Sequence, residues 1–114
     1  MVALEIKGKV MGSEPGKIPA TTIYEINLEN GALKMDLPDT LVRLNPEQEI
    51  KVIFTKDMDK ELVDKAVFCA KTRLVEKSGE NKVIVSVAGF VWVIENNDVA
   101  EYMTDKEEVY ACII

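Results

Sequence analysis

Few residues in this sequence could act in catalysis or bind a metal ion, and histidine is absent from all 114 positions. Histidine is the commonest general base at neutral pH and the commonest metal ligand in proteins. A Ser-His-Asp or Cys-His catalytic arrangement is therefore excluded. We expect no catalytic, cofactor-binding or metal-binding residues in this chain.

One acidic group has a spacing close to that of a calcium-binding loop. Asp57, Asp59 and Glu61 resemble the beginning of such a loop. The loop needs glycine at its sixth position and glutamate at its twelfth, and Leu62 and Phe68 stand there instead. We interpret the segment as a solvated turn.

A second acidic pair flanks a proline. Asp36 and Asp39 lie on either side of Pro38 and could act as paired carboxylates in acid–base chemistry. No pattern in the sequence places them in a pocket, and aspartate next to proline is typical of turns. We interpret both as turn-forming, solvated acids.

The two cysteines, Cys69 and Cys112, both lie in apolar segments with the character of strands. They do not form a Cys-x-x-Cys motif. In a reducing compartment, small buried thiols are favoured over a disulfide. We expect two unpaired cysteines in the core.

Length, charge and hydropathy limit the class of protein. The chain has the size of one domain, residues 1–114, and its net charge is −6. That charge argues against binding nucleic acid directly, because such binding depends on lysine and arginine at the phosphates. The longest apolar run is about a dozen residues, too short for a membrane helix, which needs about 20. We expect a cytoplasmic protein.

The elements that must position these residues are mostly strands, because apolar residues alternate with polar ones along most of the chain. The expected strands are 4–10, 22–29, 32–37, 50–55, 66–77, two arms within 83–95, and 108–114. About eight antiparallel strands with short turns form a small barrel or a sandwich. A barrel has the advantage that it leaves no edge strand exposed.

The expected connections are short. Asn30-Gly31 predicts a two-residue hairpin turn. We expect a turn or one helical turn at 40–44, a polar connection with a possible helical turn at 56–65, and an exposed connection at 95–107. Gly12 and the "SEPGK" segment after it are expected to end the first strand.

The stretch "VIVSVAGFVWVIE", residues 83–95, is apolar on both faces. We favour a hairpin with Ala88-Gly89 as its loop, which pairs Val87 with Phe90 and Val85 with Trp92. The alternative is one long strand kinked at Gly89. Since one small barrel cannot bury both faces of the hairpin, the surplus apolar surface predicts a contact with another protein.

Three aromatic residues, Phe90, Trp92 and Tyr110, could be stacking platforms for bases, as on nucleic-acid-binding barrels. With few aromatic residues and a negative charge, we favour a place in the core or in a protein interface.

Four stretches of the sequence resemble subunit 8 of DNA-dependent RNA polymerase in its short archaeal form. They are "LKMDLP" (33–38), "KAVFCAKTRLVE" (65–76), "VSVAGFVWVIE" (85–95) and "VYACII" (109–114). The likeness covers most of the chain from about residue 23 and is a pattern of strands. The sequence departs from the family at Ala70 and Ala88, where glycine is usual.

The resemblance implies a β-barrel of the oligonucleotide-binding (OB) type that does not itself catalyse a reaction. It also implies a subunit that packs on the largest polymerase subunit and supports assembly of the enzyme, with little or no direct contact to nucleic acid. The expected contact residues lie on one strand and on the 83–95 hairpin: Leu33, Met35, Leu37, Ala88, Gly89, Phe90 and Trp92.

Two other functions are alternatives. A free-standing single-stranded nucleic-acid-binding protein of the same fold would need a basic groove, which the charge disfavours. A small-molecule-binding barrel or enzyme would need an internal polar pocket. No motif in the sequence indicates one.

Overall fold

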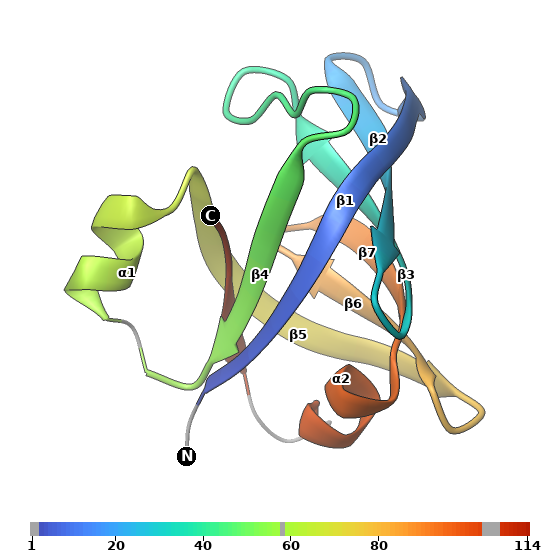
Figure 1. The fold of residues 1–114 in the computed structure, drawn as a ribbon, viewed down its shortest axis with the longest axis vertical. Coiled ribbons are helices and arrows are strands. Elements are labelled where there is room, and N and C mark those ends of the chain that lie inside the picture. Colours follow the sequence, from blue (N-terminus) through green and yellow to red (C-terminus); the bar gives the residue numbers. More distant parts are fainter. Residues whose placement is uncertain (1–2, 58, 104–107) are drawn as a thin grey trace.

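The structure, a computed structural model, describes residues 3–57, 59–103 and 108–114. These residues form a closed antiparallel barrel with short helices attached (Figure 1). The strands are β1 (Ala3–Pro15), β2 (Thr21–Leu28), β3 (Gly31–Pro38), β4 (Glu49–Thr55), β5 (Phe68–Ser78), β6 (Lys82–Val87), β7 (Phe90–Glu95) and β8 (Val109–Ile113). Their order around the barrel is β1-β2-β3-β7-β6-β5-β8-β4, and β4 pairs with β1. The predicted all-β barrel of the OB type is confirmed.

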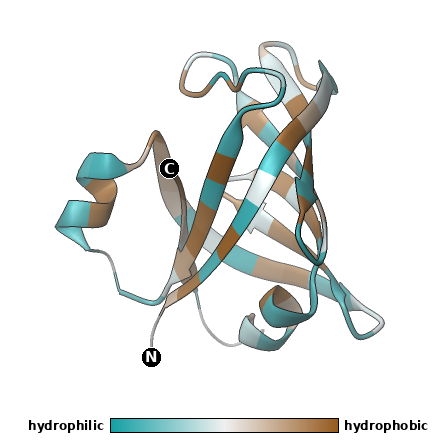
Figure 2. Ribbon diagram, viewed as in Figure 1, coloured by the Kyte–Doolittle hydropathy of each residue, from teal (hydrophilic) through white to brown (hydrophobic). Residues whose placement is uncertain are grey.

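Alternation of side chains fills the interior. Ile50, Val52 and Phe54 on β4 are buried, while Glu49 before Ile50 and Lys51 after it are exposed. Figure 2 shows the same change between apolar and polar residues along β1 and β4. Because successive side chains of a strand point to opposite faces, each strand contributes one row to a single core.

Trp92 is the largest side chain that is fully buried, and it anchors this core. Its ring lies 6.5 Å from the ring of Phe68, measured between centroids. Its indole Nε1 donates a hydrogen bond of 3.2 Å to the carbonyl oxygen of Asp36. The only polar group of this large side chain is therefore satisfied inside the barrel, as burial requires.

The 83–95 stretch is the hairpin that its sequence predicts. Val87 pairs with Phe90, and Val85 pairs with Trp92. The loop residues Ala88 and Gly89 have φ angles of 53° and 90°. Positive φ at both loop residues is the geometry of a type I′ turn, whose twist matches that of the flanking strands.

The turn between β2 and β3 lies one residue earlier than predicted. Leu28 pairs with Gly31, so Glu29 and Asn30 form the two-residue loop. Gly31 has a φ of 152°, and a Cβ built on it would overlap the carbonyl oxygen of Glu95. The glycine is therefore needed for close approach to the end of β7, and this contact with a distant strand sets the position of the turn.

The first strand is longer than predicted, and the expectation that it ends before Gly12 is wrong. Its pairing with β2 shifts at a bulge between Val10 and Gly12 and then continues to Pro15. A bulge accommodates one extra residue and lets a strand bend without ending. Its first half pairs with β4 and its second half with β2, so β1 spans most of the barrel.

The 95–107 connection is not simply exposed, because it contains helix α2 (Asn97–Tyr102). Val99, Ala100 and Met103 are buried and cover one end of the barrel. Asn96 caps the helix, since its Oδ1 accepts a hydrogen bond of 3.0 Å from the backbone of Val99. The expectation for 104–107 lies outside the described residues.

Two other connections agree with the sequence. The helical turn expected in 56–65 is helix α1 (Lys60–Lys65), and Asp59 is its N-cap residue. The backbone of Leu41 and that of Val42 both donate to the carbonyl oxygen of Pro38, which forms the turn expected there. Within the described ranges, no helix has the length and apolar character needed to cross a membrane.

The cysteines form a disulfide, so the expectation of two free thiols is wrong. Cys69 on β5 lies directly opposite Cys112 on β8, with their Cα atoms 4.1 Å apart. The residues are separated by 43 positions in the sequence. The barrel register brings them together, and no spacing rule in the sequence shows that register.

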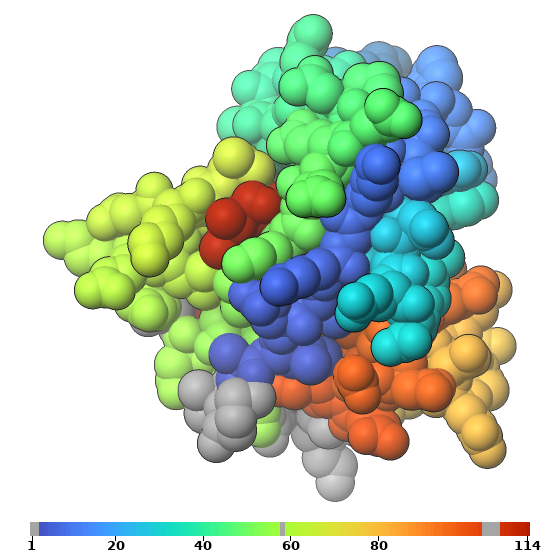
Figure 3. Space-filling model, viewed as in Figure 1, coloured from blue at the N-terminus to red at the C-terminus, as the bar shows by residue number. Residues whose placement is uncertain are grey.

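Figure 3 shows the C-terminal end of the chain, in red, at the surface between β4 and the segment around α1.

Candidate protein interface

The seven predicted contact residues divide between the interior of the barrel and the tip of the β6–β7 hairpin. Four of them have an exposed fraction of 1% or less: Leu33, Met35, Leu37 and Trp92. The register brings Met35 opposite Trp92 across β3 and β7. These four belong to the core and cannot form a contact surface in this fold. Of the predicted contact residues, Ala88 and Gly89 are exposed and Phe90 is half-buried.

The hairpin has a second row of side chains, and this row points outward. Val91 is 51% exposed, and Val93 and Ile84 beside it are half-buried. Ile84 lies directly opposite Val93 across β6 and β7. Val75, 61% exposed, comes from the neighbouring strand β5. We call Val75, Ile84, Val91 and Val93 the outer apolar face.

Local structure explains how these residues meet. Alternation along β6 and β7 sends Val83, Val85 and Ile94 into the core and leaves their neighbours outside. The pairing of β5 with β6 shifts between Leu74 and Glu76, and Val75 lies at this irregularity. Three adjacent strands thus place β-branched residues on one outer surface.

Two pairs of oppositely charged residues border the outer apolar face. Lys34, which is paired with Val93, lies 3.9 Å from a carboxylate oxygen of Glu25. Arg73 lies 3.2 Å from a carboxylate oxygen of Glu108. An apolar centre with a polar rim is the usual arrangement of a protein–protein interface.

The sequence already contained the signal for this face. Both rows of the hairpin are apolar, which predicts more apolar surface than one barrel can bury. The predicted contact residues included Trp92 from the inner row, because alternation alone does not say which row faces the core. Val75 was missed because a bulge changes the alternation of β5.

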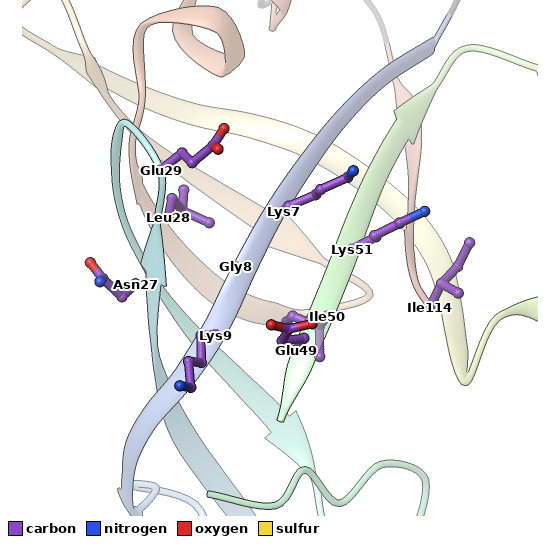
Figure 4. Close-up of a pocket in the computed structure, with 10 residues that line it drawn as sticks. All are labelled: Lys7, Gly8, Lys9, Asn27, Leu28, Glu29, Glu49, Ile50, Lys51 and Ile114. Carbon is purple, nitrogen blue, oxygen red and sulfur yellow. The ribbon is translucent and has the colours of Figure 1, made fainter. Parts of the chain in front are cut away.

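An open hollow of about 450 Å³ lies over β1, β2 and β4 (Figure 4). Lys7 and Lys51 point the same way beside it, and Glu29 lies across β1 from them. Lysine and glutamate side chains are mixed around the hollow, and Lys51 is already 3.9 Å from a carboxylate oxygen of Glu5. This mixture of charges gives the hollow no preference for an anion or a cation.

The acidic residues singled out in the sequence have local structural roles. Asp59 Oδ1 accepts a hydrogen bond of 3.0 Å from the backbone of Glu61 at the start of α1. Asp39 Oδ1 accepts one of 2.6 Å from the hydroxyl of Thr22. Asp36 has no such role, and its interpretation as a solvated turn residue is wrong, because it lies on β3 and its Oδ1 is buried without a hydrogen-bond partner. Within the part of the chain that is described, no three His, Cys, Asp or Glu residues are grouped to hold a metal ion.

Of the three aromatic candidates for base stacking, Trp92 is fully buried. Phe90 and Tyr110 are half-buried. A stacking platform needs an exposed ring face. Trp92 therefore lies in the core, which is one of the two places considered for it, and not on the contact surface where it was also predicted.

Comparison with protein families identifies one match over nearly the whole chain. The sequence model of the family described as the G subunit of DNA-directed RNA polymerase matches residues 3–114. Comparison with curated proteins gave no match. The family match covers every strand of the barrel, including those that carry the outer apolar face.

Proposed function

The chain belongs to the family of the G subunit of DNA-directed RNA polymerase, and on that premise we propose that it packs on the largest subunit and supports polymerase assembly. As a member of this family, it is an accessory, non-catalytic subunit of a nucleotidyltransferase complex. An RNA polymerase works inside the cell, and we place this subunit in the cytoplasm.

The observation that supports a packing role is the outer apolar face. Exposed apolar residues scattered singly are normal on soluble proteins, but contiguous ones with a polar rim mark an interaction site. Val75 and Val91 are more than half exposed, and Ile84 and Val93 lie between them on adjacent strands. The exposed hairpin turn, Ala88-Gly89, borders the same surface.

The test is co-expression of the tagged chain with the largest polymerase subunit, followed by purification in high salt. An apolar interface is expected to survive high salt, because salt screens charges but does not weaken burial of apolar surface. Stoichiometric co-purification supports the proposal. Elution of the chain alone contradicts it.

A charge in the outer apolar face separates the interface from the fold. Val91→Asp is expected to weaken retention at least about tenfold, because the carboxylate would be buried without a partner. The side chain is 51% exposed in the free chain, so the thermal midpoint of the isolated protein should change little. Met11→Asp, at 61% exposed and on β1, is the matched control and should leave retention unchanged.

No observation favours the alternative of a free-standing nucleic-acid-binding protein. The net charge is −6, and Trp92 is inside the barrel. Titration with single-stranded oligonucleotides at low salt is expected to show little or no binding. Tight, salt-dependent binding would favour the alternative over the assembly role.

A further inference from the structure

The Cys69–Cys112 disulfide is asymmetric in its exposure. Cys112 is fully buried, while Cys69 is partly exposed. The two residues form a pair next to the end of the register that joins β5 to β8. The Cys69 half of the disulfide is therefore partly exposed to solvent, and the Cys112 half is not.

Strand pairing explains the asymmetry. Cys112 is flanked on both sides, by Ile53 of β4 and by Cys69 of β5. On its other side, β5 pairs with β6 only from Thr72 onward. The backbone at Cys69 therefore has a strand neighbour on one side only, and the residue is partly exposed.

A disulfide is unusual in the reducing interior of a cell, so its presence in this subunit needs an explanation. A polymerase subunit works among intracellular thiols, which keep most cysteines reduced. Intracellular disulfides in most organisms are transient, catalytic or redox-sensing, and hyperthermophile proteins are the main exception. A disulfide with one partly exposed cysteine is a candidate for exchange with a small thiol.

We propose that Cys69 is a thiol-exchange site through which small intracellular thiols open and close the link between β5 and β8. A thiolate attacks Sγ of Cys69, the bond to Sγ of Cys112 breaks, and the electron pair leaves with Cys112 as a thiolate that takes up a proton. A second thiolate attacks the incoming sulfur and releases Cys69. The protein disulfide gains two electrons, and two small thiols are oxidised to their disulfide.

The structure also indicates what changes when the link opens. β8 has only five residues and holds its place by pairing with β4 on one side and β5 on the other. These backbone ladders do not depend on the sulfur–sulfur bond. The reduced chain therefore stays a barrel, with a β8 that opens more often.

The experiment uses the purified full chain, equilibrated in glutathione buffers of increasing reducing strength and then trapped with an alkylating reagent. Mass spectrometry is expected to show reversible gain of two thiols, with glutathione in the mixed-disulfide intermediate attached to Cys69 at least about ten times more often than to Cys112. The thermal midpoint should fall by roughly 10 °C or more on reduction. Amide hydrogen exchange should rise in β8 and stay unchanged in β6 and β7.

Variants keep each part of the proposal falsifiable. In Cys112→Ala, the remaining Cys69 should take up glutathione, whereas in Cys69→Ala the remaining Cys112 should not. The double variant Cys69→Ala/Cys112→Ala is the control, and reductant should no longer change its thermal midpoint. If one single variant does not fold, the trapping experiment on the native chain still reports which sulfur reacts.

Three results would overturn the proposal. The first is a chain that keeps two free thiols under every oxidising buffer. The second is a disulfide that opens only when the protein is globally unfolded. The third is mixed disulfide formed equally at the two cysteines, which would mean that the difference in burial does not control the reaction.

Discussion

The β6–β7 hairpin and the β4–β8–β5 seam both complete the barrel, but they are held together in different ways. The hairpin joins neighbours in the chain through the two-residue turn Ala88-Gly89. The seam joins strands that are far apart in sequence, through a five-residue strand and a disulfide. In Figure 1 the seam lies between β4 and β5, next to the C-terminus.

The difference concerns the order in which contacts can form. A hairpin closes a short loop and forms in microseconds, while distant strands must first overcome the entropy of closing a long loop. We therefore infer that the hairpin forms early in folding and the seam forms late. The predictions below test this order, from the largest expected effect to the smallest.

Removing the largest core side chain of the hairpin should have the largest effect. Trp92→Ala is expected to lower the free energy of unfolding by about 3–5 kcal/mol, because it leaves a cavity and an unpaired carbonyl at Asp36. Chemical denaturation measures the change. Val91→Ala, next to it on the outer row, is the control and should cost less than about 0.5 kcal/mol.

The matching change in the seam is Ile113→Ala on β8. Ile113 is fully buried, so the expected loss is about 2–4 kcal/mol. If the seam forms late, stopped-flow kinetics should show faster unfolding and nearly unchanged refolding. A large slowing of refolding would contradict the proposed order. Ile114→Ala, one residue further and half-buried, should have a smaller effect.

The far end of the hairpin depends on Gly31. Gly31→Ala should destabilise the protein by about 2–3 kcal/mol, since the new Cβ would overlap the carbonyl oxygen of Glu95 at a positive φ. Gly79 also has a positive φ but has no atom within 4 Å of the site of a Cβ. Gly79→Ala should cost only about 1 kcal/mol, so the difference in thermal unfolding between the two variants measures the clash.

The smallest expected effect is a gain. Ala88 has a φ of 53°, which costs a residue with a Cβ about 1 kcal/mol. Ala88→Gly should therefore raise the free energy of unfolding by about 0.5 kcal/mol, after the greater flexibility of glycine in the unfolded chain is subtracted. An early hairpin predicts that the gain appears as faster refolding. Loss of stability would show that Ala88 makes a contact that outweighs its strain.

The same contrast explains how much could be predicted from the sequence. The hairpin register around Ala88-Gly89 was predictable, because a two-residue loop and alternation act over a few residues. The disulfide was not, because the pairing of Cys69 with Cys112 depends on how the whole barrel closes. Asn30-Gly31 predicted a turn, but the position of that turn depends on Glu95, a residue of another strand.

The candidate interface was only partly predictable, because one part of it depends on the local hairpin sequence and the other part on closure of the barrel. Two apolar rows on one hairpin predict a partner, and the family match supports a multisubunit complex. The choice between the rows needed the closed barrel, which buries Trp92 and leaves Val91 outside. Helix α2 was missed because six residues give too little periodicity, although Val99, Ala100 and Met103 lie on one face.

Closure of the barrel affects how a cell can supply this subunit. Each strand of the described barrel has a hydrogen-bonded neighbour on either side over at least part of its length, so a free copy presents no complete strand edge to other chains. A copy made before its partner is therefore expected not to pair with other sheets through its strand edges. Surplus copies of the subunit are then expected to be less prone to aggregation through strand edges than an open sheet would be.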